Sequence, residues 1–266
     1  MARARKDEAA GRIAGAVLIG LALCLPAAGE ETQATTPLSP ECQSGGEAIV
    51  TESPLPNVAA ALASRKTIKI LSIGASPAAG RRTIKGGYTS LIEQILERAI
   101  KGLDVVMINR GVSGELAANA AIRIRTEVAL NRPDLVLWQV GTNDALAYVP
   151  VPQIDATVVD TLGWLRRHQV DAILVGLQYF EGMARNPHYI AVRDDLRKIA
   201  AREKTIIVRR DEAMQMINLA KTEGGIPLPD EFEQTEAGYT CLAQYVARAI
   251  AVGVFGKSLR RDTGGP

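Results

Sequence analysis

From residue 58 onward, short apolar runs alternate with longer amphipathic stretches. The apolar runs are rich in Val, Ile and Leu and occupy residues 67–73, 104–109, 134–140, 171–177 and 205–208. The amphipathic stretches lie at 88–101, 115–130, 153–168, 187–203, 211–223 and 236–252, with a short candidate helix at 58–64. Strands that are apolar throughout are covered on both faces. We therefore predict a three-layer α/β/α sandwich with a five-stranded, mostly parallel sheet, whose active site lies at the carboxyl ends of the strands.

The first 29 residues have the pattern of a secretory signal peptide. Four basic residues precede an uncharged stretch at 13–25, which is shorter than the ~20 residues needed to span a bilayer. Small residues at Ala27 and Gly29 predict cleavage after Gly29. The alternatives are lipoprotein processing at Cys24, which the bulky Leu23 disfavours, and a retained N-terminal anchor. Cleavage would place the mature protein in the periplasm or outside the cell, without stable membrane insertion.

Removing this peptide takes four basic and two acidic residues from totals of 31 and 29, so the mature chain has no net charge. A neutral chain lacks the electrostatic footprint of a nucleic-acid or anionic-membrane binder. We interpret residues 30–57 as a flexible leader, 58–256 as one domain and 257–266 as a disordered tail. Two cysteines remain, Cys42 and Cys241. An exported protein with an even number of cysteines favours a disulfide, although two unpaired thiols are the alternative.

Small and polar residues follow the first three apolar runs, which places them at one edge of the predicted sheet. Ser76 follows the first run, Gly114 the second and Asn143 the third. Asp230 and Glu233 stand just before the last amphipathic stretch. Each motif is weak when taken singly, because small residues after strands usually form turns. Their common order along the chain is more specific.

This order of motifs resembles the SGNH (GDSL-type) hydrolases from about Ile68 to Ile250, and more narrowly their exported alphaproteobacterial members. The resemblance implies that Ser76 is the nucleophile. It also implies that Gly114 and Asn143 donate hydrogen bonds to the oxyanion of the tetrahedral intermediate. Asp230 and Glu233 align without a gap on the D-x-x-H motif of the family, so Glu233 stands where histidine is expected.

The missing histidine changes the expected chemistry, because a serine nucleophile needs a base. A glutamate with a pKa near ~4.3 is a weak base unless burial raises that pKa. His168 ends a helix at the amino edge of the sheet, so we interpret it as a surface residue. His188 follows the fourth strand at the carboxyl edge. It is either an ordinary helix-start residue or a displaced base or substrate contact. Tyr179, in the same loop, is a candidate substrate contact.

The resemblance implies an ester hydrolase, or a closely related acyltransferase, that acts on small O-acyl esters such as acetylated glycans with an atypical base. The alternative is an inactive binding or scaffolding protein that kept the fold and lost the histidine. The sequence contains no metal-ligand cluster, phosphate loop or dinucleotide fingerprint, so no metal and no cofactor is expected. The expected partner is a small-molecule or glycan ester, not nucleic acid.

Overall fold

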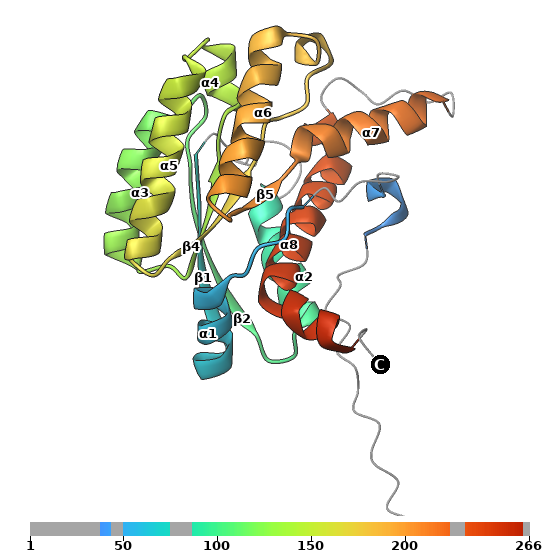
Figure 1. Cartoon of the computed structure of the whole chain (residues 1–266). Coiled ribbons are helices and arrows are strands. Elements are labelled where there is room, and N and C mark those ends of the chain that lie inside the picture. Colours follow the sequence, from blue (N-terminus) through green and yellow to red (C-terminus); the bar gives the residue numbers. More distant parts are fainter. Residues whose placement is uncertain (1–37, 44–49, 75–86, 224–231, 263–266) are drawn as a thin grey trace, which may run out of the picture. The chain divides into compact units, whose positions relative to one another are not determined.

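A five-stranded parallel sheet forms the centre of the domain (Figure 1). The computed structural model describes residues 38–43, 50–74, 87–223 and 232–262, all within one compact unit, Gln33–Pro266. The strand order is β2-β1-β3-β4-β5. The strands are β1 (Thr67–Gly74), β2 (Asp104–Gly111), β3 (Leu135–Gln139), β4 (Asp171–Val175) and β5 (Ile206–Val208). The predicted sandwich is confirmed, and every strand begins and ends within about two residues of its predicted run.

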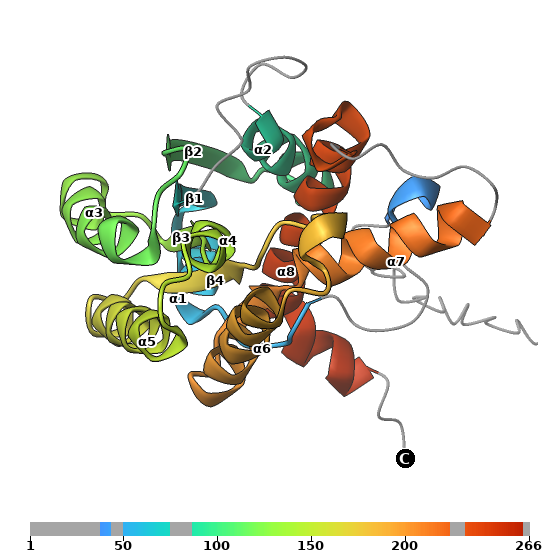
Figure 2. The same cartoon turned by 90° about the horizontal axis from the view of Figure 1, so that it is seen from above.

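Helices cover both faces of the sheet (Figures 1 and 2). One layer contains α1 (Pro56–Arg65), α2 (Gly87–Ala99), α7 (Arg210–Glu223) and α8 (Glu236–Asp262). The other contains α3 (Ala117–Asn131), α5 (Val151–Arg167) and α6 (Pro187–Arg202). Short elements are α4 (Thr142–Leu146), η1 (Pro40–Cys42), η2 (Glu181–Met183) and η3 (Phe232–Gln234). Neighbouring strand residues face opposite layers, as Ile70 and Leu71 do, which explains why the strands are apolar throughout.

The predicted disulfide is present between Cys42 and Cys241. Both cysteines are fully buried, and the Tyr245 hydroxyl donates a hydrogen bond to the Cys42 carbonyl at 2.6 Å. The bridge therefore fastens η1 to the second turn of α8. Closing a loop of 199 residues restricts the unfolded chain, which stabilises the fold in the chain-entropy view.

Residues 50–57, predicted as leader, pack against the sheet and α8. Val50 forms an antiparallel bridge with Val208 on the β5 edge. The Leu55 amide donates to the Gly253 carbonyl at 3.0 Å, and the Leu55 side chain is buried. Gly253 permits this contact, because a Cβ there would lie 2.6 Å from the Leu55 side chain. The ordered domain thus begins before the predicted boundary at residue 58.

The last helix is longer than its pattern predicted. α8 continues to Asp262, whereas the amphipathic pattern ends at residue 252 and the tail was expected from 257. No proline interrupts residues 236–262, so nothing in the sequence stops the helix there. Residues 263–266 and the predicted signal peptide lie outside the described residues. Among the described helices, none combines the length and apolar character that crossing a membrane requires.

The register of the sheet aligns the carboxyl ends of β1, β2 and β3 with one another. Gly74, the last residue of β1, pairs with Gly111 of β2 and Gln139 of β3. Gly74 has a φ of +101°, and a Cβ at this position would lie 2.1 Å from the Gln139 carbonyl oxygen. Only glycine fits there. β1 therefore ends with Gly74 at the carboxyl edge, and Ser76 lies outside the described residues.

Candidate active site

The turn after β2 and the start of α4 meet at the carboxyl edge. Gly114 lies in that turn with a φ of +79°, and among the described residues other than its two chain neighbours no atom lies within 4 Å of the position its Cβ would take. Asn143 is the second residue of α4, and its side-chain amide donates to the Glu115 carbonyl at 3.0 Å. In the described part of the chain, neither the Gly114 N–H nor the second Asn143 amide hydrogen has an acceptor. The Asn143 amide is therefore tethered to the residue next to Gly114, in the turn after β2.

Buried polar contacts hold this arrangement in place. The Asp144 carboxylate accepts a hydrogen bond from the Ala117 amide at 2.9 Å, which ties α4 to the first turn of α3. The Glu115 side chain is 3% exposed and pairs with Arg123 at 2.7 Å. Fixed contacts of this kind are what preorganised donors require.

Glu233, at the predicted histidine position, is buried and already engaged. Its Oε1 accepts a hydrogen bond from the Tyr179 amide at 2.8 Å. Its Oε2 forms an ion pair with Arg210. Burial raises the pKa of the Glu233 carboxyl, while the Arg210 charge and the Tyr179 N–H oppose that rise. The carboxylate therefore joins η3 to the loop after β4 and to α7.

Arg210 is the residue that sequence reasoning missed. It begins α7 directly after β5 and is only 3% exposed (Figure 1). The Arg210 charge also acts on three buried tyrosines. Burial raises the pKa values of Tyr88, Tyr189 and Tyr239, and the positive charge of Arg210 opposes each rise. A signal was available, since a basic residue after the fifth apolar run belongs to the same edge as Glu233.

His188 and Tyr179 occupy different parts of the edge. The His188 ring stacks on Tyr148, with 5.1 Å between ring centroids. Its Nε2 is enclosed and has no hydrogen-bond partner among the described residues, while its backbone N–H donates to the helix-capping Asn186 side chain at 2.9 Å. Tyr179 meets Glu233 through its backbone, and its hydroxyl accepts from Asn218 at 3.4 Å. Within the described residues, no hydrogen bond or ion pair joins His188 to Glu233 or Asn143.

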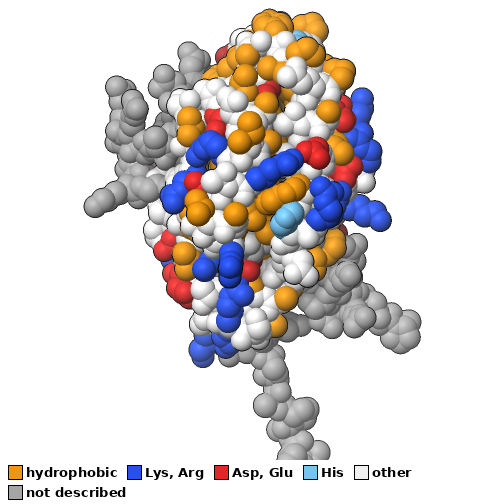
Figure 3. Space-filling view, turned by 90° about the vertical axis from the view of Figure 1, so that its left-hand side faces the viewer, with side chains coloured by type: hydrophobic (Ala, Val, Ile, Leu, Met, Phe, Trp, Pro, Cys, Tyr) orange, Lys and Arg blue, Asp and Glu red, His pale blue; other side chains and the backbone are white. Residues whose placement is uncertain are grey.

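Hydrophobic side chains are exposed around this edge. Val112 and Leu146 are each 44% exposed and Tyr148 is 61% exposed. In Figure 3 hydrophobic side chains gather at the upper end of the molecule, the end at which α4 lies in Figure 1. An apolar surface beside the oxyanion donors suits the acyl part of an ester.

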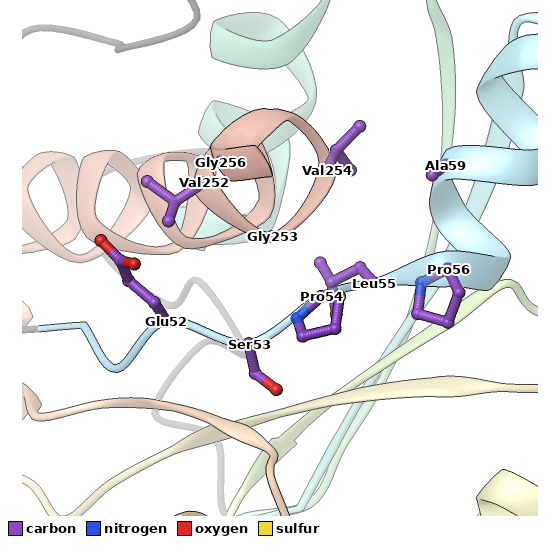
Figure 4. A pocket seen from close by; sticks show the side chains of 10 residues that line it. All are labelled: Glu52, Ser53, Pro54, Leu55, Pro56, Ala59, Val252, Gly253, Val254 and Gly256. Carbon is purple, nitrogen blue, oxygen red and sulfur yellow. The ribbon is translucent and has the colours of Figure 1, made fainter. Parts of the chain in front are cut away.

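A pocket away from this edge lacks catalytic chemistry. It lies between residues 52–56 and the 252–256 segment of α8, where Leu55 faces Gly253 (Figure 4). Its lining is mainly apolar, with Glu52 and Ser53 as the polar side chains. Within the described residues, no three His, Cys, Asp or Glu side chains come close enough to hold a metal ion.

Two predicted site residues, Ser76 and Asp230, lie outside the described residues. Their roles as nucleophile and acid stay predictions. The described half of the candidate site is therefore the predicted oxyanion donors Gly114 and Asn143 and the Arg210–Glu233 ion pair.

Asp211, beside Arg210, is expected to make folding pH-dependent. Burial raises its pKa from 3.8 to about 6. Between these values the folded state keeps a proton that the unfolded state has lost, so stability falls as pH rises, by at most about 3 kcal/mol. Urea unfolding at pH 4 to 8 measures this fall, and Asp211→Asn is expected to flatten it. An equal fall in both proteins would contradict the assignment to Asp211.

Comparison with known proteins places this fold among the esterases of the SGNH type. Esterase TesA from Pseudomonas aeruginosa is 27% identical over 147 residues, which are 55% of this chain and 71% of TesA. An arylesterase from Vibrio mimicus is 28% identical over 118 residues, 44% of this chain and 58% of that protein. The chain is thus a distant homologue of ester hydrolases.

Among solved structures, a variant of Axe2, an acetyl xylan esterase from Geobacillus stearothermophilus, has a TM-score of 0.55 at 20% identity, covering 69% of this chain and 94% of Axe2. Catalytic mutants of Axe2 replace an aspartate and a histidine three positions later. At this identity the likeness concerns the fold. Residues 41–255 of this chain match the Non-GDSL lipase-like family. This match extends over most of the chain, and the protein therefore belongs to the Non-GDSL lipase-like family.

Proposed function

We propose that the protein is an exported serine ester hydrolase that acts on small O-acyl esters, with acetylated glycans as the leading substrate class. Its family and its esterase relatives support the reaction type. The acetyl xylan esterases that share its fold motivate the choice of glycan. An acyltransferase is a close variant of the same proposal, because only the acceptor of the acyl group differs.

One observation carries the proposal: the Asn143 side-chain amide is tethered to the carbonyl of Glu115, the residue that follows Gly114. In the proposed reaction, Ser76 Oγ forms a bond to the acyl carbon, and the carbonyl oxygen becomes an oxyanion. Gly114 and Asn143 stabilise that charge. The alcohol leaves with a proton, and water then releases the acid from Ser76. A chain that had no use for an oxyanion would not need donors held in this way.

The proton transfers are expected to be the slow steps of this reaction, because the usual imidazole base is missing. In the D-x-x-H motif that we propose for Asp230 to Glu233, a carboxylate replaces imidazole. The serine proton has to go to Glu233, assisted by Asp230, or to His188, whose Nε2 has no hydrogen-bond partner among the described residues. Turnover is therefore expected to be slow.

We also propose that the protein is exported from the cytoplasm. A signal peptide at residues 1–29, an alphaproteobacterial source and a periplasmic or secreted location all fit the sequence pattern described above. The Cys42–Cys241 disulfide supports an oxidising compartment.

A second function has its own supporting observation. The Arg210–Glu233 ion pair fills the place of the base, which favours a non-catalytic binding protein that retains the esterase fold. The two functions differ in whether Ser76 reacts.

Hydrolysis of p-nitrophenyl acetate and of acetylated xylo-oligosaccharides by the purified protein distinguishes them. We expect a slow rate that Ser76→Ala removes. Ser64→Ala, at the opposite edge in α1, is the matched control and should keep the native rate. Equal rates in the native protein and Ser76→Ala would favour the binding protein.

A further inference from the structure

Arg210 and Glu233 form a buried ion pair at the position expected for the base. Arg210 and Glu233 are 3% and 6% exposed and come from different elements, α7 and η3. A buried charge is costly unless it is paired. In the described region, Glu233 is the acid that pairs with Arg210, because its neighbour Asp211 faces Arg193 at 3.9 Å instead.

Burial raises the pKa of the Glu233 carboxyl, and its two contacts oppose that rise and so reduce its strength as a proton acceptor. One oxygen is used by the Tyr179 amide and the other faces the guanidinium. A cation at this distance stabilises the ionised form of a carboxyl group. Tyr88, Tyr189 and Tyr239 also lie within the influence of the Arg210 charge, and because burial raises their pKa values they bring no compensating negative charge.

We propose that Arg210 is a positioning residue that holds Glu233 as an ion-paired carboxylate, so that Glu233 accepts the serine proton efficiently only when the Arg210 charge is removed. This rests on the proposed function. In the released state the Ser76 proton would move to Glu233 as the Oγ–carbon bond forms. The same proton would then go to the departing alcohol, which leaves Glu233 ionised again.

A consequence concerns repair of the motif. Glu233→His alone would leave Arg210 buried without its counter-ion and beside an imidazole. The Arg210 charge disfavours the imidazolium that must form during catalysis. Glu233→His is therefore expected to stay slow unless Arg210 is also neutralised.

Carbon-13 NMR of glutamate carboxyl groups in the full protein tests the proposal directly. The Glu233 signal is assigned by its absence in Glu233→Gln. In the native protein we expect Glu233 to be ionised at about pH 7, and in Arg210→Gln its titration midpoint should rise by roughly 1–3 pH units. Arg210→Lys keeps the charge and should leave the midpoint within about one unit of the native value.

Arg197→Gln is the matched control, since it also removes a cation that pairs with carboxylates, here Asp194 and Glu212. It should not move the Glu233 midpoint. A midpoint unchanged in folded Arg210→Gln would overturn the proposal. If Arg210→Gln does not fold, the native titration decides, because a Glu233 that is protonated at pH 7 contradicts an ion-paired carboxylate.

Ester hydrolysis by the same variants separates this proposal from the proposed function. In Arg210→Gln the Ser76-dependent rate should increase about threefold or more above the new midpoint, with a pH profile that follows it. If the native rate depends on Ser76 but Arg210→Gln does not change it, the Arg210 proposal fails and the proposed function stands. If neither protein shows Ser76-dependent turnover, the proposed function fails, while the NMR titration still decides the ion-pair assignment.

Discussion

Arg210→Met is expected to destabilise the domain by about 3–5 kcal/mol, because it leaves the buried Glu233 carboxylate without its counter-ion. Removing both charges should cost much less. In Arg210→Met/Glu233→Gln the amide oxygen can still accept the Tyr179 N–H, and no buried charge remains. We expect this double variant to lose only about 1–2 kcal/mol.

Urea unfolding of the two single variants and the double variant measures the coupling between the residues. Arg125→Met is a suitable control, because Arg125 and its partner Asp160 are 44% and 65% exposed. Loss of that surface pair should cost about 0–1 kcal/mol. Strictly additive effects at Arg210 and Glu233 would mean that the ion pair contributes nothing to folding.

Asn143→Ala is expected to lower the Ser76-dependent rate by about 10²–10³-fold. The variant removes the amide that lies beside Gly114, held there by the Glu115 carbonyl. Because the charge on the oxyanion develops only in the transition state, the loss should fall on kcat rather than on KM. Steady-state kinetics with p-nitrophenyl acetate gives both constants.

Asn131→Ala provides the comparison for this variant. Asn131 ends α3, and its side chain donates to the Glu127 carbonyl at 3.0 Å, far along the helix from the turn that carries Gly114. It should keep the native rate. If Asn143→Ala folds and also keeps the native rate, the oxyanion assignment is wrong.

The elements were predictable because each strand and helix has its own hydrophobic period. The disulfide was predictable because two cysteines follow the expected cleavage site. By contrast, the contact between Leu55 and Gly253 joins residues far apart in sequence, so composition gave residues 50–57 the character of a leader. Local pattern carries no information on such contacts.

The candidate site, like the fold, was predictable only in part. Motif order predicted that Gly114 and Asn143 lie at one edge, and Asn143 bonds the carbonyl of Glu115, the neighbour of Gly114, while their role as oxyanion donors stays a prediction. It also identified Glu233 as unusual. The Arg210–Glu233 pair could not be derived, because 23 positions separate the two residues and neither stands in a motif that names the other. Their pairing follows from two chain segments that meet only in the folded protein.

Covalent labelling of Ser76 tests the central claim most directly. The purified protein, Ser76→Ala and Asn143→Ala are incubated with a fluorophosphonate, in which a reactive serine displaces fluoride and gains a phosphonyl group. Intact-protein and peptide mass spectrometry then locate the adduct. A serine hydrolase predicts a single adduct on Ser76, slow to form, weaker in Asn143→Ala and missing in Ser76→Ala. A folded native protein that gains no adduct on Ser76 would contradict that function.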